Sequence, residues 1–420
     1  MTQARLFEVA STTSQSVTTT FADNMKIPVH RWFRYSAGYS ADWVGQVLND
    51  HSSGRVLDPF AGSGTTLLAA QSSGLTSIGL ESHPFVVRVA SAKLDWLEDP
   101  EAFRAAATTI SGRVEPATTS DLPPLLLKCF YPDQVSELLG LRNEISKLDQ
   151  AHGVNRLLWL AFIAVIRSTS HVGTAQWQYV LPNKRKASVA RPISAFLGQV
   201  EMMAQDMTSR ALTVGHEPPD ATVLQSDART CAGVEDGWAT VVVCSPPYAN
   251  NYDYADATRL EQTVLGEVES WADLKDVRTH LMHSCSQHMN GYPVSDALAD
   301  PVLEPILPQL RPTYEALAEL RELRQGKKAY DSMIVAYFRD MANTWSALRR
   351  VCAKGAEVCF VVGDSAPYGV HVPVERWLGE LAVASGFKQW RFEKVRDRNT
   401  KWKNRKHRVP LQEGRLWIDG

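Results

Sequence analysis

Asp58-Pro59-Phe60-Ala61-Gly62-Ser63-Gly64-Thr65-Thr66 joins a short apolar segment, 55–58, to a stretch with helical apolar spacing, 65–73. A second apolar segment follows at 76–81. This order of strand, glycine-rich turn, helix and strand predicts a βαβ unit at the start of a parallel sheet. Open α/β sheets bind ligands beyond the carboxyl ends of their strands, so the glycine-rich turn is the first candidate for a binding site.

Further strand patterns continue the sheet along the chain. Residues 239–244 contain the run Val241-Val242-Val243, which is typical of a buried parallel strand. The remaining strands are expected at 221–227, 356–364, 388–395 and 415–418. We therefore expect an α/β fold with a doubly wound, mostly parallel sheet and helices on both faces.

Two stretches interrupt this alternation. Helical patterns at 134–148, 155–167 and 192–214 predict a helical insertion, and a polar stretch broken by Pro301, Pro305, Pro308 and Pro312 predicts a second one. The chain then divides into a flexible polar arm (1–26), a cofactor-binding half of the core (27–127), the first helical insertion as candidate for target recognition (128–216), core with a catalytic turn (217–265), the second helical insertion (266–328), and the last part of the core with a basic segment (329–420).

Composition excludes several classes of protein. The 420 residues carry a net charge of −2 and are 44% hydrophobic, which suits two or three globular units rather than a disordered chain or a coiled coil. The longest apolar run, 157–166, is too short to cross a bilayer, and the first residues lack a signal-peptide pattern. Six scattered cysteines show no metal-ligand spacing, so we expect a cytoplasmic protein without a metal site.

Three acidic residues follow three of the expected strands. Gly62 and Gly64 allow the backbone to approach a ligand closely, and Asp58 offers a carboxylate suited to an ammonium group. Glu81 follows 23 residues later, the spacing of an acid that binds ribose hydroxyls, and Asp227 is placed to meet an adenine amino group. The alternatives to a binding site are that the glycine-rich turn binds no ligand and that the acids are solvated residues at the strand ends. A phosphate-binding loop is excluded because no Gly-Lys-Ser/Thr follows, and the third glycine of a dinucleotide fingerprint is missing.

Cys244-Ser245-Pro246-Pro247-Tyr248 follows the buried strand at 239–244 and is the candidate catalytic turn. The two prolines keep the turn extended and cannot donate hydrogen bonds, which leaves carbonyl acceptors, the Ser245 hydroxyl and the Tyr248 ring. Such a pocket suits a planar ring with an exocyclic NH₂ group. Acceptance of the two amino hydrogens by Ser245 and the Pro246 carbonyl would direct the nitrogen lone pair toward an electrophilic methyl group, with Tyr248 stacked on the ring.

These motifs resemble those of the S-adenosylmethionine-dependent DNA methyltransferases of the exocyclic-amino class. The stretch 58–65 resembles the methionine-contacting motif, Ser245-Pro246-Pro247-Tyr248 resembles the catalytic motif in its N4-cytosine form, and 27–35 resembles a segment that closes over the methionine end of the cofactor. Segment 353–364 also resembles a later strand of the family, and 411–413 resembles the segment before its last strand. The resemblance implies a seven-stranded Rossmann-like methyltransferase sheet, S-adenosyl-L-methionine as cofactor, and a cofactor site of His30, Trp32, Tyr35, Asp58, Pro59, Phe60, Ala61, Gly62, Gly64, Thr65, Glu81, Asp227 and Ala228.

The resemblance further implies methylation of cytosine N4 at a short site in duplex DNA, with the target base turned out of the stack. The common N6-adenine form begins with Asp or Asn where this chain has Ser245, and Cys244 precedes the turn rather than following a proline, which argues against a covalent C5-cytosine mechanism. N6-adenine methylation, an exocyclic amine in structured RNA, and a catalytically silent nucleic-acid-binding subunit stay as alternatives.

Basic residues gather in two places that are candidates for phosphate contacts or, alternatively, are solvated faces. The candidate nucleic-acid-binding residues are Lys184, Arg185, Lys186, Arg396, Arg398, Lys401, Lys403, Arg405 and Lys406. Duplex DNA is the expected partner, a restriction or defence-system protein is a further candidate, and no membrane partner is expected.

Two groups of side chains are ambiguous by sequence. Tyr252 and Tyr254 fit either a pocket wall or helix packing. His30, His83, His171 and His407 show neither triad nor metal-ligand spacing, and we expect ordinary structural or surface histidines.

Overall fold

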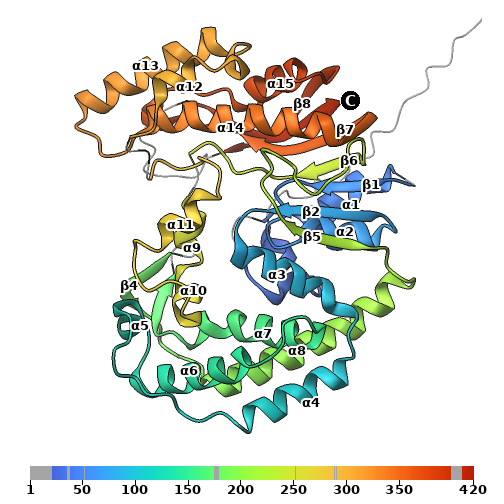
Figure 1. The fold of residues 1–420 in the computed structure, drawn as a ribbon, viewed down its shortest axis with the longest axis vertical. Helices are drawn as coiled ribbons and strands as arrows, with labels where there is room; N and C mark the ends of the chain where they lie inside the picture. Colours follow the sequence, from blue (N-terminus) through green and yellow to red (C-terminus); the bar gives the residue numbers. More distant parts are fainter. Residues whose placement is uncertain are drawn as a thin grey trace, which may run out of the picture.

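The fold is a seven-stranded sheet, shown in a computed structural model that describes residues 21–35, 38–51, 53–174, 179–250, 252–287, 289, 291–398 and 409–420 (Figure 1). The strand order is β5-β2-β1-β6-β7-β9-β8. The first five of these strands run parallel, and β9 is antiparallel to both β7 and β8. The strands are β1 (Arg55–Asp58), β2 (Thr76–Glu81), β5 (Ala221–Gln225), β6 (Ala239–Cys244), β7 (Cys352–Gly363), β8 (Gln389–Arg398) and β9 (Leu411–Asp419). The predicted seven-stranded, mostly parallel Rossmann-like sheet is confirmed.

Alternating side chains on the central strands build two separate cores. Val241 and Val243 pack on one face with α1 (Ala41–Asn49) and α2 (Thr65–Ser72). Val242 packs on the other face with α14 (Tyr330–Val351) and α15 (Val374–Ala384). Because successive strand residues point to opposite faces, an unbroken Val-Val-Val run requires helices on both sides.

The helices between β2 and β5, together with α10, form a third core beside the sheet, in the lower part of Figure 1. Leu157–Ile166 lies inside α7 and is almost wholly buried in this core, which explains its apolar run without a membrane. The helices are α3 (Pro84–Leu94), η3 (Asp95–Leu97), α4 (Pro100–Ser111), α5 (Pro124–Cys129), α6 (Pro132–Ser146), α7 (Gly153–Thr169), α8 (Pro192–Val214) and α10 (Arg259–Leu265). In the described part of the chain, no helix is long and apolar enough to cross a membrane.

The first insertion contains strands as well as helices. An antiparallel pair, β3 (Val172–Thr174) and β4 (Val180–Arg185), lies between α7 and α8. The expectation of a purely helical stretch is wrong there, because the segment is too short and too polar to show a period-2 pattern.

The second insertion joins the α-helical part to the sheet on the left of Figure 1. Its elements are α11 (Leu274–Thr279), α12 (Val294–Leu298), η4 (Pro301–Leu303) and α13 (Leu307–Leu323), and the short α9 (Tyr254–Ala257) precedes it. Contrary to expectation, Pro308 is the second residue of α13, and Pro312 lies within the helix without ending it. A proline in the first turn is tolerated because its missing N–H has no partner within the helix, whereas Pro312 interrupts one backbone bond.

The polar arm falls mostly outside the described residues. Its last six residues form η1 (Phe21–Lys26), in which the Asn24 side chain is fully buried. Asn24 Nδ2 donates to the Tyr39 carbonyl at 2.8 Å and Asn24 Oδ1 accepts from the Ala41 N–H at 2.9 Å. Asn24 therefore anchors the start of the fold to the N-terminus of α1.

Candidate active site

A cleft that is partly open to solvent runs along the carboxyl ends of β1, β2, β5 and β6. The glycine-rich turn after β1 and the Ser245 turn after β6 both line it. These two turns meet because β1 and β6 are neighbouring parallel strands. Nine of the predicted cofactor residues line the cleft: Tyr35, Pro59, Phe60, Ala61, Gly62, Thr65, Glu81, Asp227 and Ala228.

Asp58 lies behind the glycine-rich turn, fully buried and outside the cleft lining. Its carboxylate accepts hydrogen bonds from Thr66 Oγ1 at 2.5 Å, from the Tyr39 hydroxyl at 3.1 Å and from the Phe60 N–H at 3.0 Å. Burial raises the pKa of Asp58 to about 6, although the three donors oppose this rise. In this arrangement Asp58 holds the glycine-rich turn through the Phe60 N–H and does not line the cleft.

Glu81 connects the neighbouring strand ends. Its two carboxylate oxygens accept from the Gly62 N–H at 3.0 Å and from the His83 N–H at 2.8 Å. Gly62 has a φ of +51°, and an added Cβ there would lie 3.0 Å from the Tyr35 ring. Burial raises the pKa of Glu81 to about 7, so a neutral polar ligand suits this acid better than a second anion.

Asp227 follows β5 and is paired within its own loop. Arg229 Nε and Nη2 bind the Asp227 carboxylate at 2.9 Å and 2.6 Å, and the Arg229 N–H donates at 2.8 Å. Since β5, β2 and β1 are adjacent, the three acids lie at the ends of neighbouring strands: Asp58 and Glu81 are the last residues of β1 and β2, and Asp227 follows β5.

The Ser245 turn places only part of its predicted catalytic set in the cleft. Ser245 and Pro247 line it, whereas Pro246 is buried and Tyr248 lies outside the lining. The Arg398 guanidinium lies over the Tyr248 ring, with its carbon 5.0 Å from the ring centre. Burial raises the pKa of Tyr248 above its usual range, so the phenol stays neutral.

Arg398 is held in place by the end of β7. Its Nη1 donates to the Asp364 carbonyl at 2.8 Å, and its Nε lies 3.8 Å from Glu413 Oε2. A Cβ on Gly363 would come within 2.7 Å of Arg398 Nη1, so only glycine leaves this space. One face of the Tyr248 ring is therefore covered by a residue predicted to bind phosphate.

Comparison with known proteins shows what the chain is similar to. A family model described as DNA methylase matches residues 48–92, which include β1, the glycine-rich turn and β2. The Type II methyltransferase M.BsoBI of Geobacillus stearothermophilus is 23% identical over 89% of this chain and 82% of its own length. The Type II methyltransferases M.AvaI of Anabaena variabilis and M.MvaI of Kocuria varians are both 22% identical, over 87% and 78% of this chain and 80% and 74% of their own lengths.

The chain is a homologue of the exocyclic-amino DNA methyltransferases. The match to M.BsoBI covers 89% of this chain, so the similarity extends well beyond residues 48–92. Methyltransferases of this family use S-adenosylmethionine as methyl donor.

Two predicted cofactor residues, His30 and Trp32, lie away from this cleft. His30 lines a second cavity beside α1 and α8, and burial lowers its pKa well below the usual range. Trp32 is buried, and its Nε1 donates to Asp206 on α8 at 3.0 Å. The predicted Gly64 also stays outside the lining, where its φ of +83° starts α2. Of the segment expected to close over the methionine, Tyr35 alone of the three predicted residues reaches the cleft.

The cleft also contains residues that sequence reasoning did not select: Gly38, Tyr39, Ser63, Leu80, Ser82, His83, Ser226, Tyr254, Leu281, Met282 and Ser284. Residues 281–284 come from the second insertion, which shows no motif. Of the two ambiguous tyrosines, Tyr254 lines the cleft, and Tyr252 is buried with its ring centre 4.6 Å from that of Tyr254.

Unpaired polar atoms in the cleft fit a nucleoside-bearing cofactor. Ser63 Oγ and His83 Nδ1 are buried without a hydrogen-bond partner among the described residues. Burial lowers the pKa of His83 to about 4, so its ring is neutral, and its Nε2 already contacts Thr258 Oγ1 at 3.0 Å. A ligand with hydroxyl and amino groups would satisfy both atoms.

The predicted nucleic-acid residues have different surroundings. Lys184 and Arg185 on β4 are exposed, whereas Lys186 Nζ donates to the carbonyls of Arg167 and Ser170 at the end of α7. Arg396 Nη2 pairs with the buried Glu413 at 2.8 Å. Lys401, Lys403, Arg405, Lys406 and His407 lie outside the described residues.

Proposed function

We propose that the chain is a site-specific methyltransferase acting on the exocyclic N4 amino group of cytosine in duplex DNA. The observation that carries the proposal is the shared cleft of the glycine-rich turn and the Ser245-Pro246-Pro247-Tyr248 turn, at the ends of adjacent strands. The homologous Type II methyltransferases support action on DNA. The serine at the head of the turn supports cytosine.

For the cofactor, we propose that the cleft residues after β1, β2 and β5 hold S-adenosylmethionine. Glu81 would accept from the ribose hydroxyls, Asp227 would meet the adenine amino group, and residues 59–65 would surround the methionine part. His83 and Ser63 would supply the remaining hydrogen bonds. When bound, S-adenosylmethionine supplies an electrophilic methyl group, and as the new C–N bond forms, the C–S bond breaks with its electron pair left on sulfur and one amino proton leaves for solvent.

The Ser245 turn would orient the attacking amine. The Ser245 hydroxyl and the Pro246 carbonyl accept its two hydrogens, which takes the nitrogen lone pair out of conjugation with the ring. Neither proline has an N–H group that would compete for that lone pair. The neutral Tyr248 ring would stack on the base, where stacking contributes roughly 1–3 kcal/mol.

The buried position of the turn requires the base to leave the duplex. Pro246 is buried and Ser245 is half-buried, so an amino group inside stacked DNA does not reach them. Extrusion costs a few kcal/mol, which phosphate contacts offset. Lys184 and Arg185, exposed on β4, are the described residues we assign to such contacts.

Substitution of the turn tests the proposal. Ser245→Ala is expected to lower the methylation rate on the order of a hundredfold, the usual cost of removing one positioned hydrogen-bonding group. Tyr248→Ala is expected to lower it roughly tenfold or more by loss of stacking. Ser385→Ala, on a half-buried serine at the end of α15, is the matched control and keeps full activity. Folded Ser245→Ala protein with an unchanged rate of tritium transfer to DNA would contradict the assigned role.

A further inference from the structure

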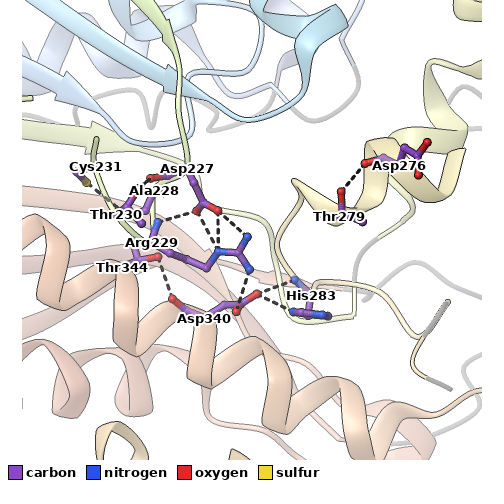
Figure 2. A network of polar contacts seen from close by, with 10 residues as sticks. All are labelled: Asp227, Ala228, Arg229, Thr230, Cys231, Asp276, Thr279, His283, Asp340 and Thr344. Atoms are coloured by element: carbon purple, nitrogen blue, oxygen red, sulfur yellow. Dashed lines mark hydrogen bonds and ion pairs between the residues drawn. The ribbon is translucent and has the colours of Figure 1, made fainter. Parts of the chain in front are cut away.

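Asp340 on α14 lies outside the cleft lining, yet its carboxylate joins two separate walls of the cleft (Figure 2). One oxygen, Oδ1, lies 3.2 Å from Arg229 Nη1. The other, Oδ2, accepts two hydrogen bonds from His283. Arg229 belongs to the loop after β5, and His283 belongs to the second insertion.

The contact of Asp340 with Arg229 fixes Asp227, the acid that follows β5. Arg229 binds Asp227 with its Nε and Nη2 and reaches Asp340 with its Nη1. The planar guanidinium thus has one carboxylate on each side, in a geometry that lysine would not reproduce. With Arg229 balancing its charge, Asp227 suits a neutral amino heterocycle better than an ammonium group.

The second connection fixes the segment 281–284. The His283 N–H donates to Asp340 Oδ2 at 3.0 Å, and His283 Nδ1 lies 2.9 Å from the same oxygen. Leu281, Met282 and Ser284, on either side of His283, line the cleft. Among the described residues, this is the part of the second insertion that reaches the cofactor cleft.

Burial makes the contacts of Asp340 with Arg229 and His283 sensitive to substitution. The Asp340 residue is 6% exposed, yet His283 and Arg229 hold the pKa of its carboxyl below the usual range against the effect of burial. A buried carboxylate with three charged or polar donors is a rigid anchor, because loss of its charge leaves those donors without a partner.

We propose that Asp340 is a positioning residue for cofactor binding, which fixes Asp227 through Arg229 and the segment 281–284 through His283. Asp340 itself does not touch the ligand. The two walls that it fixes would hold the adenine end of the cofactor between them. This inference rests on the placement of S-adenosylmethionine in the proposed function, but not on the identity of the target base or nucleic acid.

The test compares two buried aspartates of the same helix. Asp340→Asn is expected to raise the Kd of S-adenosylhomocysteine about tenfold in calorimetric titration, with kcat at saturating cofactor changed less than about threefold. Asp331→Asn breaks a buried ion pair to Arg321 of 3.0 Å on the far side of α14 and is expected to leave this Kd unchanged. An unchanged Kd in folded Asp340→Asn protein, or an equal rise in both variants, would overturn the proposal.

Single substitutions of Arg229 and His283, the two partners of Asp340, keep the proposal falsifiable if Asp340→Asn does not fold. Arg229→Lys and His283→Ala should each raise the Kd of S-adenosylhomocysteine about threefold to fivefold, while His280→Ala, on an exposed neighbour, should not. Hydrogen exchange of residues 281–284 should quicken in His283→Ala; unchanged exchange and unchanged Kd in both variants would refute the proposed role. Because binding is measured without DNA, a chain that binds the cofactor in this way but methylates no DNA would refute the proposed function and leave this inference standing.

Discussion

At the scale of single residues, buried acids hold the turns that line the proposed cofactor cleft. Asp58 has no counter-cation among its hydrogen-bond donors, which are two hydroxyls and one backbone N–H. The folded protein therefore binds a proton at this carboxyl more readily than the unfolded chain does. Such a group makes stability fall as the pH rises from its unfolded pKa toward its folded pKa.

Asp58→Asn should remove this pH dependence. Burial raises the pKa of Asp58 to about 6, so between about pH 4 and pH 6 the wild type should lose on the order of 3 kcal/mol of unfolding free energy relative to the variant. The asparagine amide can still donate to the Thr66 and Tyr39 hydroxyls. Urea unfolding of both proteins at pH 4, 5, 6 and 7 measures the difference; parallel curves across this range would show that Asp58 titrates normally.

Tyr248 depends on a residue from another strand. Arg398 covers its ring, and the absence of a side chain at Gly363 leaves room for the guanidinium. Arg398→Gln and Gly363→Ala should both lower the methylation rate, roughly threefold to tenfold, because both remove a cation–π contact of about 0.5–2 kcal/mol that orients the ring. The double variant should be no worse than either single variant, since both act on one contact.

Arg391→Gln is the control for Arg398→Gln. Arg391 lies on the same strand, with its guanidinium carbon 4.6 Å from the Trp417 ring centre, and makes an equivalent contact on a different aromatic residue. The methylation rate of the Arg391→Gln variant should equal that of the wild type. Equal losses in the Arg391 and Arg398 variants would show that the effect is a general weakening of β8.

At the scale of elements, the glycine-rich turn depends on the strand next to it. A Cβ on Gly79 of β2 would lie 2.7 Å from Ala61 Cβ and 2.7 Å from Leu67 Cδ1. The second strand of the βαβ unit therefore packs so closely against the turn and α2 that only a residue without a side chain fits at this position. Gly79 is an interior strand glycine of the kind that marks close packing.

Gly79→Ala should destabilise the fold by about 1–3 kcal/mol through overpacking and weaken cofactor binding, because Ala61 lines the cleft. Gly74→Ala is the control: its φ is +72° but its Cβ would meet open space, so it should cost about 1 kcal/mol and leave cofactor affinity unchanged. Denaturation and calorimetry measure both effects. A Gly79→Ala protein with wild-type cofactor affinity would contradict this coupling.

Most elements of the sheet follow from local sequence, because central parallel strands are short apolar runs bounded by turn residues. The strands at 55–58, 76–81 and 239–244 were predicted with their bounds, and helix 192–214 likewise. The sequence did not predict that residues 281–284 line the cleft. Their position depends on the long-range contact of His283 with Asp340, which leaves no local sequence pattern. The place of His30 and Lys186 is likewise decided by tertiary packing rather than by residue type.

At the scale of the whole molecule, the helical part beside the sheet carries the exposed basic strand β4. Lys184→Gln with Arg185→Gln should lower DNA affinity and reduce the slope of log K against log salt by up to about 2, about 0.9 per lost phosphate contact. Lys186→Gln, whose ammonium group bonds two carbonyls at the end of α7, should lower stability instead and keep the slope. Filter binding across a salt series separates the two, and an unchanged slope in the double variant would remove β4 from the DNA interface.

The most direct test of the account is mass spectrometry of nucleosides from DNA incubated with the protein and S-adenosylmethionine carrying a labelled methyl group. The account predicts labelled N4-methylcytosine in wild-type reactions and its loss with Ser245→Ala. Labelled N6-methyladenine in its place would move the target to adenine with the same cleft chemistry, whereas label on cytosine C5, or on no nucleoside of DNA, would contradict the central claim.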